Sequence, residues 1–156
     1  MRRWVQMFFV LPLLSVLPSL AAVRVVSPGG KVEAVVDVGA DGVLVLAVQA
    51  DGLPVLEPSP LGVVVGKTDL GRRASVGDPR LFDECLPAGR RLGENPWMLP
   101  CRTAKIPILV EGWEPREWIL EVKASDGGVA FRYIFAFPGP VTLVREVTSF
   151  AFPAST

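Results

Sequence analysis

The sequence contains no histidine. Because imidazole is the side chain that titrates near neutral pH, this absence excludes hydrolases with a Ser–His or Cys–His pair and zinc sites ligated by histidine. The sequence also has no excess charge, since 16 basic residues balance 16 acidic ones. Proteins that bind nucleic acid usually carry a basic face that neutralises phosphates, so we expect no nucleic-acid partner.

Long segments free of glycine and proline are also scarce, because 15 residues of each type interrupt the chain. Both types destabilise helix interiors, so long helices are not expected. Hydrophobic residues make up 50% of the chain, which excludes intrinsic disorder. The length of 156 residues fits one domain. These features favour a single β-rich globular domain.

Residues 1–21 have the pattern of a cleaved signal peptide. Two arginines precede an almost wholly apolar run, and the small residues Ser19 and Ala21 occupy the positions that signal peptidase reads. The run is shorter than the roughly 20 residues that a membrane-spanning helix needs. We therefore predict cleavage after Ala21, a mature domain at 22–156, a secreted or periplasmic location and no membrane association after cleavage.

The only two cysteines are Cys85 and Cys101. In an oxidising compartment they are able to form a disulfide, which the chain-entropy model values at about 3 kcal/mol. The alternative is two buried free thiols, since a disulfide needs Cα atoms less than about 7 Å apart. Two cysteines without a histidine partner make a poor metal site, and we assign no metal ligand.

The mature chain alternates polar and apolar residues with the two-residue period of β-strands. Residues 31–38 alternate cleanly, whereas 43–50 are apolar on both faces, which indicates a central strand. The proline-rich segment 54–60 indicates an edge strand or an extended crossing segment. Further strands are expected at 61–65, 106–110, 118–123, 129–137 and 141–152. This succession of short strands predicts an all-β fold, an antiparallel β-sandwich.

Residues 67–100 lose this alternation, and we predict short irregular strands there with a functional or interdomain loop. The adjacent acids Asp83 and Glu84 lie in this segment, and the simplest interpretation is that both are solvated. Four further acids follow at spacings of three, three and four. These are Glu111, Glu114, Glu117 and Glu121. On a helix they would cluster for acid–base chemistry or calcium binding, but Pro115 and the strand pattern predict a solvated sheet face instead.

Tryptophans suggest a sugar-binding surface, because a flat indole stacks on the apolar face of a pyranose. Trp97 and Trp113 lie in turn-rich segments and are the candidate carbohydrate-binding residues. Trp118 belongs to an apolar strand face and is assigned to the core. The competing interpretation is that all three are buried for their area alone.

Five short sequences occur in order along the chain. They are SPGGK at 27–31, EPSPLG at 57–62, DLG at 69–71, DGGVAFRYIF at 126–135 and REVTSFAFP at 145–153. Together they resemble the N-terminal domain of glycoside hydrolase family 97. The similarity covers most of the mature chain, and the middle, from Arg72 to Glu117, departs from the family pattern.

The resemblance implies an exported bacterial protein of the calcium-dependent α-glucosidase and α-galactosidase group. In that family, this domain is a galactose-mutarotase-like super-sandwich packed on a (β/α)₈ barrel that holds the catalytic carboxylates. The sequence ends at Thr156, before a barrel and before the stretch that lends a glutamate to the family's calcium site. We therefore expect an incomplete sandwich without catalytic or metal residues, and Glu146 as a structural strand residue.

The leading functional prediction is a non-catalytic N-terminal domain that supports a calcium-dependent glycosidase barrel and is not active alone. Its expected partners are that barrel domain, or a second copy that covers an exposed hydrophobic edge. Two alternatives remain open. One is a free-standing carbohydrate-binding module that uses Trp97 and Trp113, and the other is a structural or interaction domain without a sugar ligand.

Overall fold

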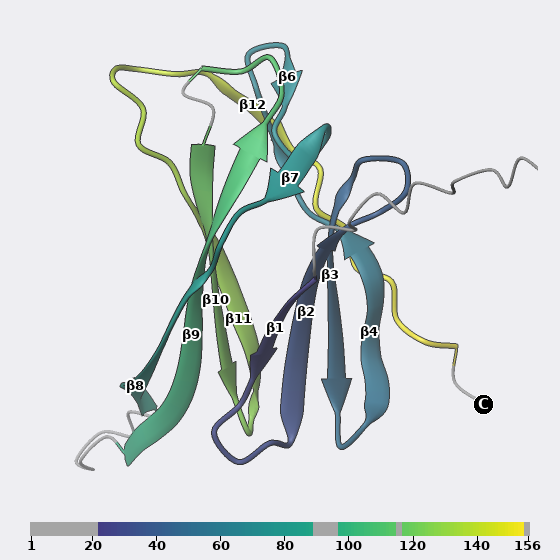
Figure 1. Ribbon diagram of the computed structural model, residues 1–156, viewed down its shortest axis with the longest axis vertical. Coiled ribbons are helices and arrows are strands. Elements are labelled where there is room, and N and C mark those ends of the chain that lie inside the picture. Colours follow the sequence, from purple (N-terminus) through teal and green to yellow (C-terminus); the bar gives the residue numbers. More distant parts are fainter. Residues whose placement is uncertain (1–21, 89–96, 115–116, 155–156) are drawn as a thin grey trace, which may run out of the picture.

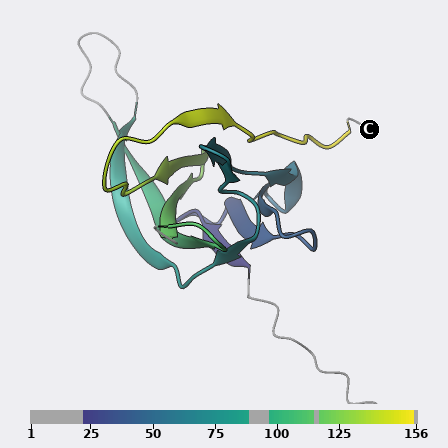
Figure 2. The ribbon, with the colours of Figure 1, turned by 90° about the horizontal axis from the view of Figure 1, so that it is seen from above.

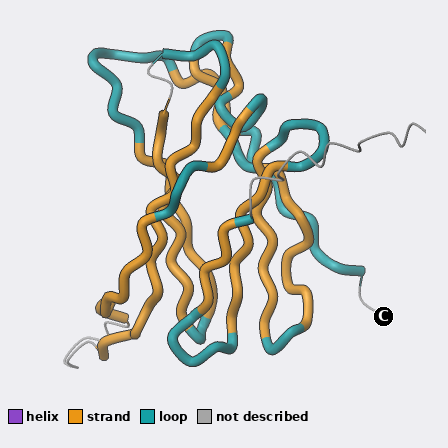
Figure 3. Tube along the Cα trace, in the orientation of Figure 1, coloured by secondary structure: helices purple, strands orange, loops and turns teal. Residues whose placement is uncertain are grey.

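The computed structural model describes residues 22–88, 97–114 and 117–154. Within these ranges every regular element is a β-strand, all strand pairs are antiparallel, and there is no helix (Figure 3). The described part accordingly contains no helix long and apolar enough to span a membrane. The predicted signal peptide lies outside the described residues. The prediction of an all-β antiparallel sandwich is confirmed.

The first sheet has the strand order β1-β2-β3-β4 (Figure 1). Its strands are β1 (Val23–Val26), β2 (Val32–Val38), β3 (Leu44–Ala50) and β4 (Leu53–Pro60). Asp51 and Gly52 join β3 to β4 with positive φ angles of 49° and 77°, as expected of a two-residue hairpin whose twist matches its strands. β3 is internal and β4 is an edge strand, as the sequence predicted.

The second sheet has the order β11-β10-β9-β7, and β8 also pairs with β9. Its strands are β7 (Ala74–Val76), β8 (Arg80–Ala88), β9 (Trp97–Val110), β10 (Glu117–Ser125) and β11 (Gly128–Ile134). β7 and β8 follow one another along the same edge of β9. Between them, the N–H of Gly77 donates to the Pro107 carbonyl at 2.8 Å, which keeps the chain against β9.

The expectation of short irregular strands at 67–100 is wrong for β8, which is nine residues long and pairs with β9 throughout. None of its described side chains is fully buried, so its sequence need not alternate to fill a core. The strand expected at 141–152 is shorter than predicted. A small third sheet joins β12 (Leu143–Glu146), β5 (Val63–Val65) and β6 (Thr68–Asp69), and Glu146 is indeed a strand residue.

The core lies where β1, β2 and β3 face β9 and β10. Seen from above, β12 and the C-terminal segment run along the outside of this pair of sheets (Figure 2). Trp118 is among the largest fully enclosed side chains, with 2% of its surface exposed. Its ring meets Tyr133 edge-on at 5.3 Å between centroids. The assignment of Trp118 to the core is therefore confirmed.

Candidate functional site

Three of the five short sequences that carry the resemblance meet at one junction beside the core. The Tyr133 hydroxyl lies 2.6 Å from Thr148 Oγ1 and accepts the N–H of Gly62 at 3.2 Å. Burial raises the pKa of the Tyr133 phenol, which therefore stays protonated. One side chain thus joins three phrases that are far apart in the sequence: GVAFRY, PSPLG and REVTSF.

Two glycines allow the backbone to close this junction. A Cβ at Gly62 would lie 2.9 Å from the Cα of Gly71, and a Cβ at Gly71 would overlap the carbonyl oxygen of Leu61. The neighbouring Leu70 carbonyl accepts the Trp118 indole N–H at 3.3 Å. DLG and PSPLG therefore pass one another at a distance that only glycine permits.

The SPGGK phrase forms a second joint at the opposite end of the sandwich. Ser27 Oγ donates to Asp126 Oδ1 at 2.6 Å, and the N–H of Gly29 donates to the same oxygen at 3.1 Å. Ser27 Oγ also accepts the N–H of Val32 at 3.0 Å. The bond from Ser27, and then that from Gly29, lowers the pKa of Asp126. This carboxylate fastens the β1–β2 turn to the β10–β11 turn.

Three carboxylates of the second sheet, Asp83, Glu84 and Glu121, form ion pairs. Glu121 is 2% exposed, which contradicts the predicted solvated face, although Glu111 and Glu117 are exposed as expected. Asp83 forms an ion pair with Arg102. Glu84 binds Lys123, whose ammonium lowers the pKa of this carboxyl group.

The register between neighbouring strands explains why the sequence pattern did not predict these ion pairs. Glu121 lies opposite Lys105 on β9 and opposite Arg132 on β11. Sequence spacing does not reveal such neighbours. Glu84 also accepts the hydroxyl of Thr103, so the interpretation of a solvated acidic pair is wrong for Glu84, whereas the Asp83 side chain is 64% exposed.

The described part of the chain contains no group of three Asp, Glu or Cys side chains close enough to hold a metal ion. We assign no calcium ligand to the described residues. The strongest carboxylate cluster, around Glu121 and Glu84, is filled by cationic side chains instead.

The two cysteines are free. Cys101 pairs with Glu84 and Cys85 with Pro100 across β8 and β9, so the cysteines are one step out of register and face opposite sides of the sheet. Cys101 is buried and Cys85 is exposed. The disulfide considered from the sequence is therefore not present in this structure, and burial raises the pKa of the Cys101 thiol.

The candidate tryptophans lie near opposite ends of β9. Trp97 begins β9, and its side chain lies outside what the structure describes, whereas Trp113 follows the other end of the same strand. A strand rises about 3.3 Å per residue, so β9 itself spans up to about 43 Å between these ends. Trp113 is half-buried and meets Phe137 edge-on at 5.7 Å. Sugar binding at either residue stays a prediction.

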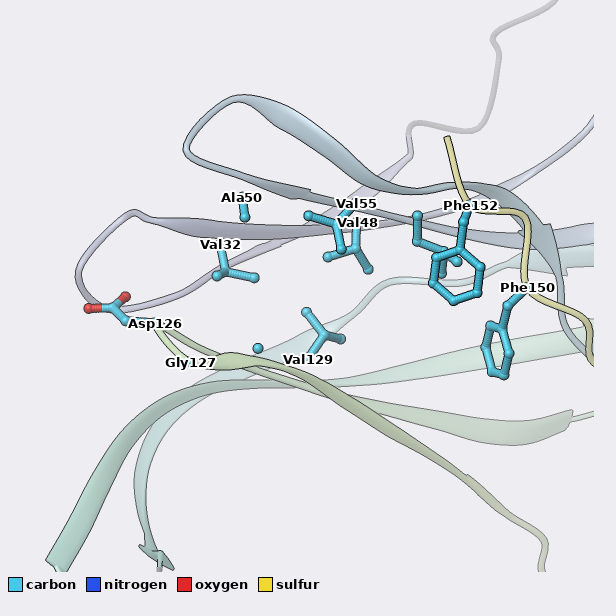
Figure 4. Close-up of a pocket in the computed structure, with 11 residues that line it drawn as sticks. Val32, Val48, Ala50, Val55, Asp126, Gly127, Val129, Phe150 and Phe152 are labelled. Atoms are coloured by element: carbon cyan, nitrogen blue, oxygen red, sulfur yellow. The ribbon is translucent and has the colours of Figure 1, made fainter. Parts of the chain in front are cut away.

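An apolar groove of about 430 Å³ opens between the first sheet and β11 (Figure 4). Val48 and Val55 line one side and Val129 the other, while Phe150 and Phe152 stand at its mouth. Phe152 is 71% exposed and Phe150 is 53% exposed. Unlike the core between the two sheets, this region leaves apolar side chains in contact with water.

The groove is bordered by backbone that is only partly paired. The segment 147–151 runs along β4, where Ser149 N–H donates to Pro60 O at 3.1 Å and Glu57 N–H to Ala151 O at 2.9 Å. β11 pairs with β10 on one edge, and no described strand pairs with its other edge. The groove and this free edge together form an incompletely covered side of the fold.

A family model described as Glycosyl-hydrolase 97 N-terminal matches residues 25–156. The chain belongs to this family. The match confirms the family resemblance seen in the five phrases. In this family 97 N-terminal chain, those phrases are structural joints, since they form the Tyr133 junction and the Asp126 joint.

Solved structures show the same fold. A beta-arabinopyranosidase superposes with a TM-score of 0.73 at 24% identity, covering 84% of this chain and 21% of that one. A glycoside hydrolase family 97 enzyme from Pseudoalteromonas sp. strain K8, in complexes with panose and with acarbose, gives 0.70 at 18% identity. That match covers 83% of this chain and 20% of the enzyme. A comparison with curated proteins finds no match.

This family 97 N-terminal chain therefore spans about a fifth of the length of the solved structures it matches. At identities below 25% these likenesses concern the fold alone. The ligands panose and acarbose belong to the Pseudoalteromonas enzyme.

Proposed function

We propose that this chain is a non-catalytic β-sandwich that supports the catalytic domain of a family 97 glycoside hydrolase. The observation that carries the proposal is the incompletely covered side of the fold, where the apolar groove meets the free edge of β11. Exposed apolar patches on soluble proteins commonly mark surfaces that a partner covers. The partner in this proposal is the rest of the enzyme.

The ion pairs and hydrogen bonds of the described carboxylates favour a structural role over a catalytic one. Glycosidases of the usual kind need two carboxyl groups flanking a sugar-sized space, one to donate a proton and one to act as base or nucleophile. Here Glu121 and Glu84 are held by cations, and Asp126 is held by Ser27 and Gly29. Each of these carboxylates is engaged in holding strands together.

Export and calcium belong to the same proposal. Residues 1–21 have the composition of a signal peptide, which supports a secreted or periplasmic location. Since the described carboxylates do not form a metal site, calcium in this proposal is bound by the rest of the enzyme. The sugar complexes of the Pseudoalteromonas enzyme support a carbohydrate substrate for that complete enzyme.

The test is hydrolysis of p-nitrophenyl α-glucoside and α-galactoside by the purified chain, with calcium and with a chelator. We expect no release of p-nitrophenol above a protein-free blank in either condition. Turnover that survives repurification and falls on substituting a carboxylate of this chain would overturn the proposal.

A second experiment tests the supporting role itself. The corresponding segment of the Pseudoalteromonas enzyme is replaced by this chain, and hydrolysis by the chimera is measured beside a chimera carrying Trp118→Ala. The proposal predicts activity in the first chimera and its loss in the second, whose sandwich core is damaged. Equal activity in both would contradict a supporting role.

A further inference from the structure

Strand β8 lies at the edge of the second sheet, where its only described partner strand is β9 (Figure 1). None of its described side chains is fully buried, and Leu81, Asp83 and Cys85 are exposed. The register of a strand is specified strongly where one of its faces fills a core, and weakly where neither face does. The register of β8 against β9 is therefore weakly specified.

The same edge of β9 already accommodates one change of register. Val76 of β7 lies opposite Ile108, and Arg80 of β8 lies opposite Lys105. The chain thus advances four residues along this edge while β9 advances three, so one extra residue lies between β7 and β8. Shifting β8 by one further residue along β9 adds a second residue to this irregular stretch and leaves the pairing of β7 unchanged.

Charge does not oppose such a shift. In the observed register Asp83 lies opposite Arg102 and forms an ion pair with it. Glu84 lies on the other face, where it binds Lys123 and accepts the hydroxyl of Thr103. After a shift of one residue, Glu84 would lie opposite Arg102 and Asp83 opposite Thr103. The two neighbouring acids exchange places, so each cation keeps a carboxylate beside it.

The same shift brings the two cysteines together. Cys85 lies opposite Pro100 and Cys101 lies opposite Glu84, so a shift of one residue places Cys85 opposite Cys101 on the same face. Opposite residues in a hydrogen-bonded antiparallel pair have Cα atoms about 5.5 Å apart. A disulfide spans that separation without strain.

Proline explains why the reduced chain keeps the observed register. The Pro107 carbonyl accepts the N–H of Gly77 at 2.8 Å, so the odd-numbered residues of β9 direct their backbone groups toward β7 and β8. In the observed register Leu99 lies opposite Leu86, which has an N–H to donate. After the shift Leu99 would lie opposite Pro87, which has none, and one ladder hydrogen bond would be lost.

We propose that β8 has a second register, shifted by one residue along β9, and that a disulfide between Cys85 and Cys101 locks it. The oxidant is a small-molecule disulfide such as oxidised glutathione. The exposed Cys85 attacks it as the thiolate, forming a mixed disulfide and releasing one glutathione thiolate. In the shifted register the Cys101 thiolate attacks the Cys85 sulfur and releases the second, so two electrons and two protons pass from the protein to glutathione.

Oxidation would exchange the two faces of β8. Phe82 and Leu86, which are half-buried, would move to the exposed face, and Leu81 and Pro87 would replace them. The surface that this edge of the second sheet presents would thus depend on the redox state of the two thiols. This inference does not depend on the supporting role proposed above.

The experiment exposes the purified chain to oxidised glutathione. Mass spectrometry follows the disulfide, and cross-strand NOEs report the register. The reduced chain should show NOEs between Phe82 and Thr103. We expect an intramolecular disulfide on oxidation, with NOEs to Thr103 from Asp83 in place of Phe82. Glutathione adducts that never close to the disulfide, or a disulfide formed with the original NOEs unchanged, would overturn the proposal.

Two proline variants distinguish a shift of register from general loosening of the strand. Pro87→Ala supplies the N–H that is missing only in the shifted register, so the disulfide should form about fivefold faster, as one recovered hydrogen bond predicts. Pro100→Ala is the matched control, because even-numbered residues of β9 direct their backbone groups away from β8 in both registers. It should oxidise like the unchanged chain, and equal rates in the two variants would contradict the shift.

A third variant forms the disulfide without any shift. Glu84→Cys combined with Cys85→Ser places a thiol opposite Cys101 in the observed register. It should oxidise at least about tenfold faster than the unchanged chain, in which only a minor population is shifted at any time. Its NOEs between Phe82 and Thr103 should persist. An unchanged chain that oxidises as fast as this variant would show that no shift is needed.

Discussion

The two halves of the sandwich differ in how their apolar faces are covered. In the closed half, β1 and β2 face β9 and β10, and Val25 and Leu120 have no exposed surface. In the open half, Val55 of β4 lines the groove opposite Val129 of β11, and Val55 and Phe152 are 46% and 71% exposed. The comparison indicates that the closed half maintains the fold, while the open half is the surface that our proposal assigns to a partner.

The largest effect is expected in the closed half. Trp118→Ala removes an enclosed indole and its hydrogen bond to Leu70, so we predict a loss of about 3–5 kcal/mol in the free energy of unfolding. Urea denaturation followed by circular dichroism measures it. Trp113→Ala, which truncates a half-buried ring, should cost clearly less, and equal losses would contradict the distinction between the two positions.

The next largest loss of stability is expected at the close approach of Gly62 and Gly71, which we call the glycine crossing. Gly71→Ala places a methyl group against the Leu61 carbonyl, and we expect a loss of about 1–3 kcal/mol from overpacking. Gly139→Ala is the control, because a Cβ there meets no atom within 4 Å. A Gly71 variant as stable as the Gly139 variant would show that the crossing is looser than described.

The Tyr133 junction should contribute less than the crossing. Tyr133→Phe keeps the ring contacts but leaves the N–H of Gly62 and the hydroxyl of Thr148 without this partner. We predict a loss of about 1–2 kcal/mol by urea denaturation. Phe135→Leu, a change in a neighbouring ring without a hydroxyl, controls for general repacking. If Tyr133→Phe leaves the free energy of unfolding unchanged, the junction is held by packing alone.

Acid should weaken the Asp126 joint. The hydrogen bonds from Ser27 and Gly29 lower the folded-state pKa of Asp126 below its usual 3.8. The unfolded state therefore binds the proton more readily, so this contribution to stability is present above that value and disappears as pH falls through the folded-state pKa. Stability measured between about pH 5 and pH 3 should decline less in Asp126→Asn than in the unchanged chain. Identical declines would contradict the assigned role.

The smallest effect on stability is expected in the open half. Phe152→Ser changes a residue that is 71% exposed, so the free energy of unfolding should change by less than about 0.5 kcal/mol. Self-association measured by sedimentation velocity should decrease, because the variant reduces the exposed apolar surface. A large loss of stability would show that Phe152 belongs to the core.

Sequence periodicity predicted the strands that bury one face, such as β2 and β10, because their alternation fills the core. It missed β8, whose described side chains are not fully buried and which is held mainly through its pairing with β9. The aromatic face of β11 was also predictable, and Phe131 and Tyr133 lie 5.8 Å apart.

Functional features were less accessible to sequence reasoning. Glu121 was assigned to a solvated face, since its partners Arg132 and Lys105 come from two other strands and only the register places them beside it. The disulfide considered from the sequence is absent from this structure for a similar reason, because a one-residue offset puts Cys85 and Cys101 on opposite faces. The five phrases identified the family, but their structural role became visible only at the Tyr133 junction.

The most direct test of the distinction between the halves is native-state hydrogen exchange on the purified chain. The account predicts the slowest exchange in β2, β9 and β10, and much faster exchange at the free edge of β11 and in the Leu53–Leu56 part of β4. Protection of those two segments equal to that of β10 in the monomer would contradict it, because the open half would then be as complete as the closed one.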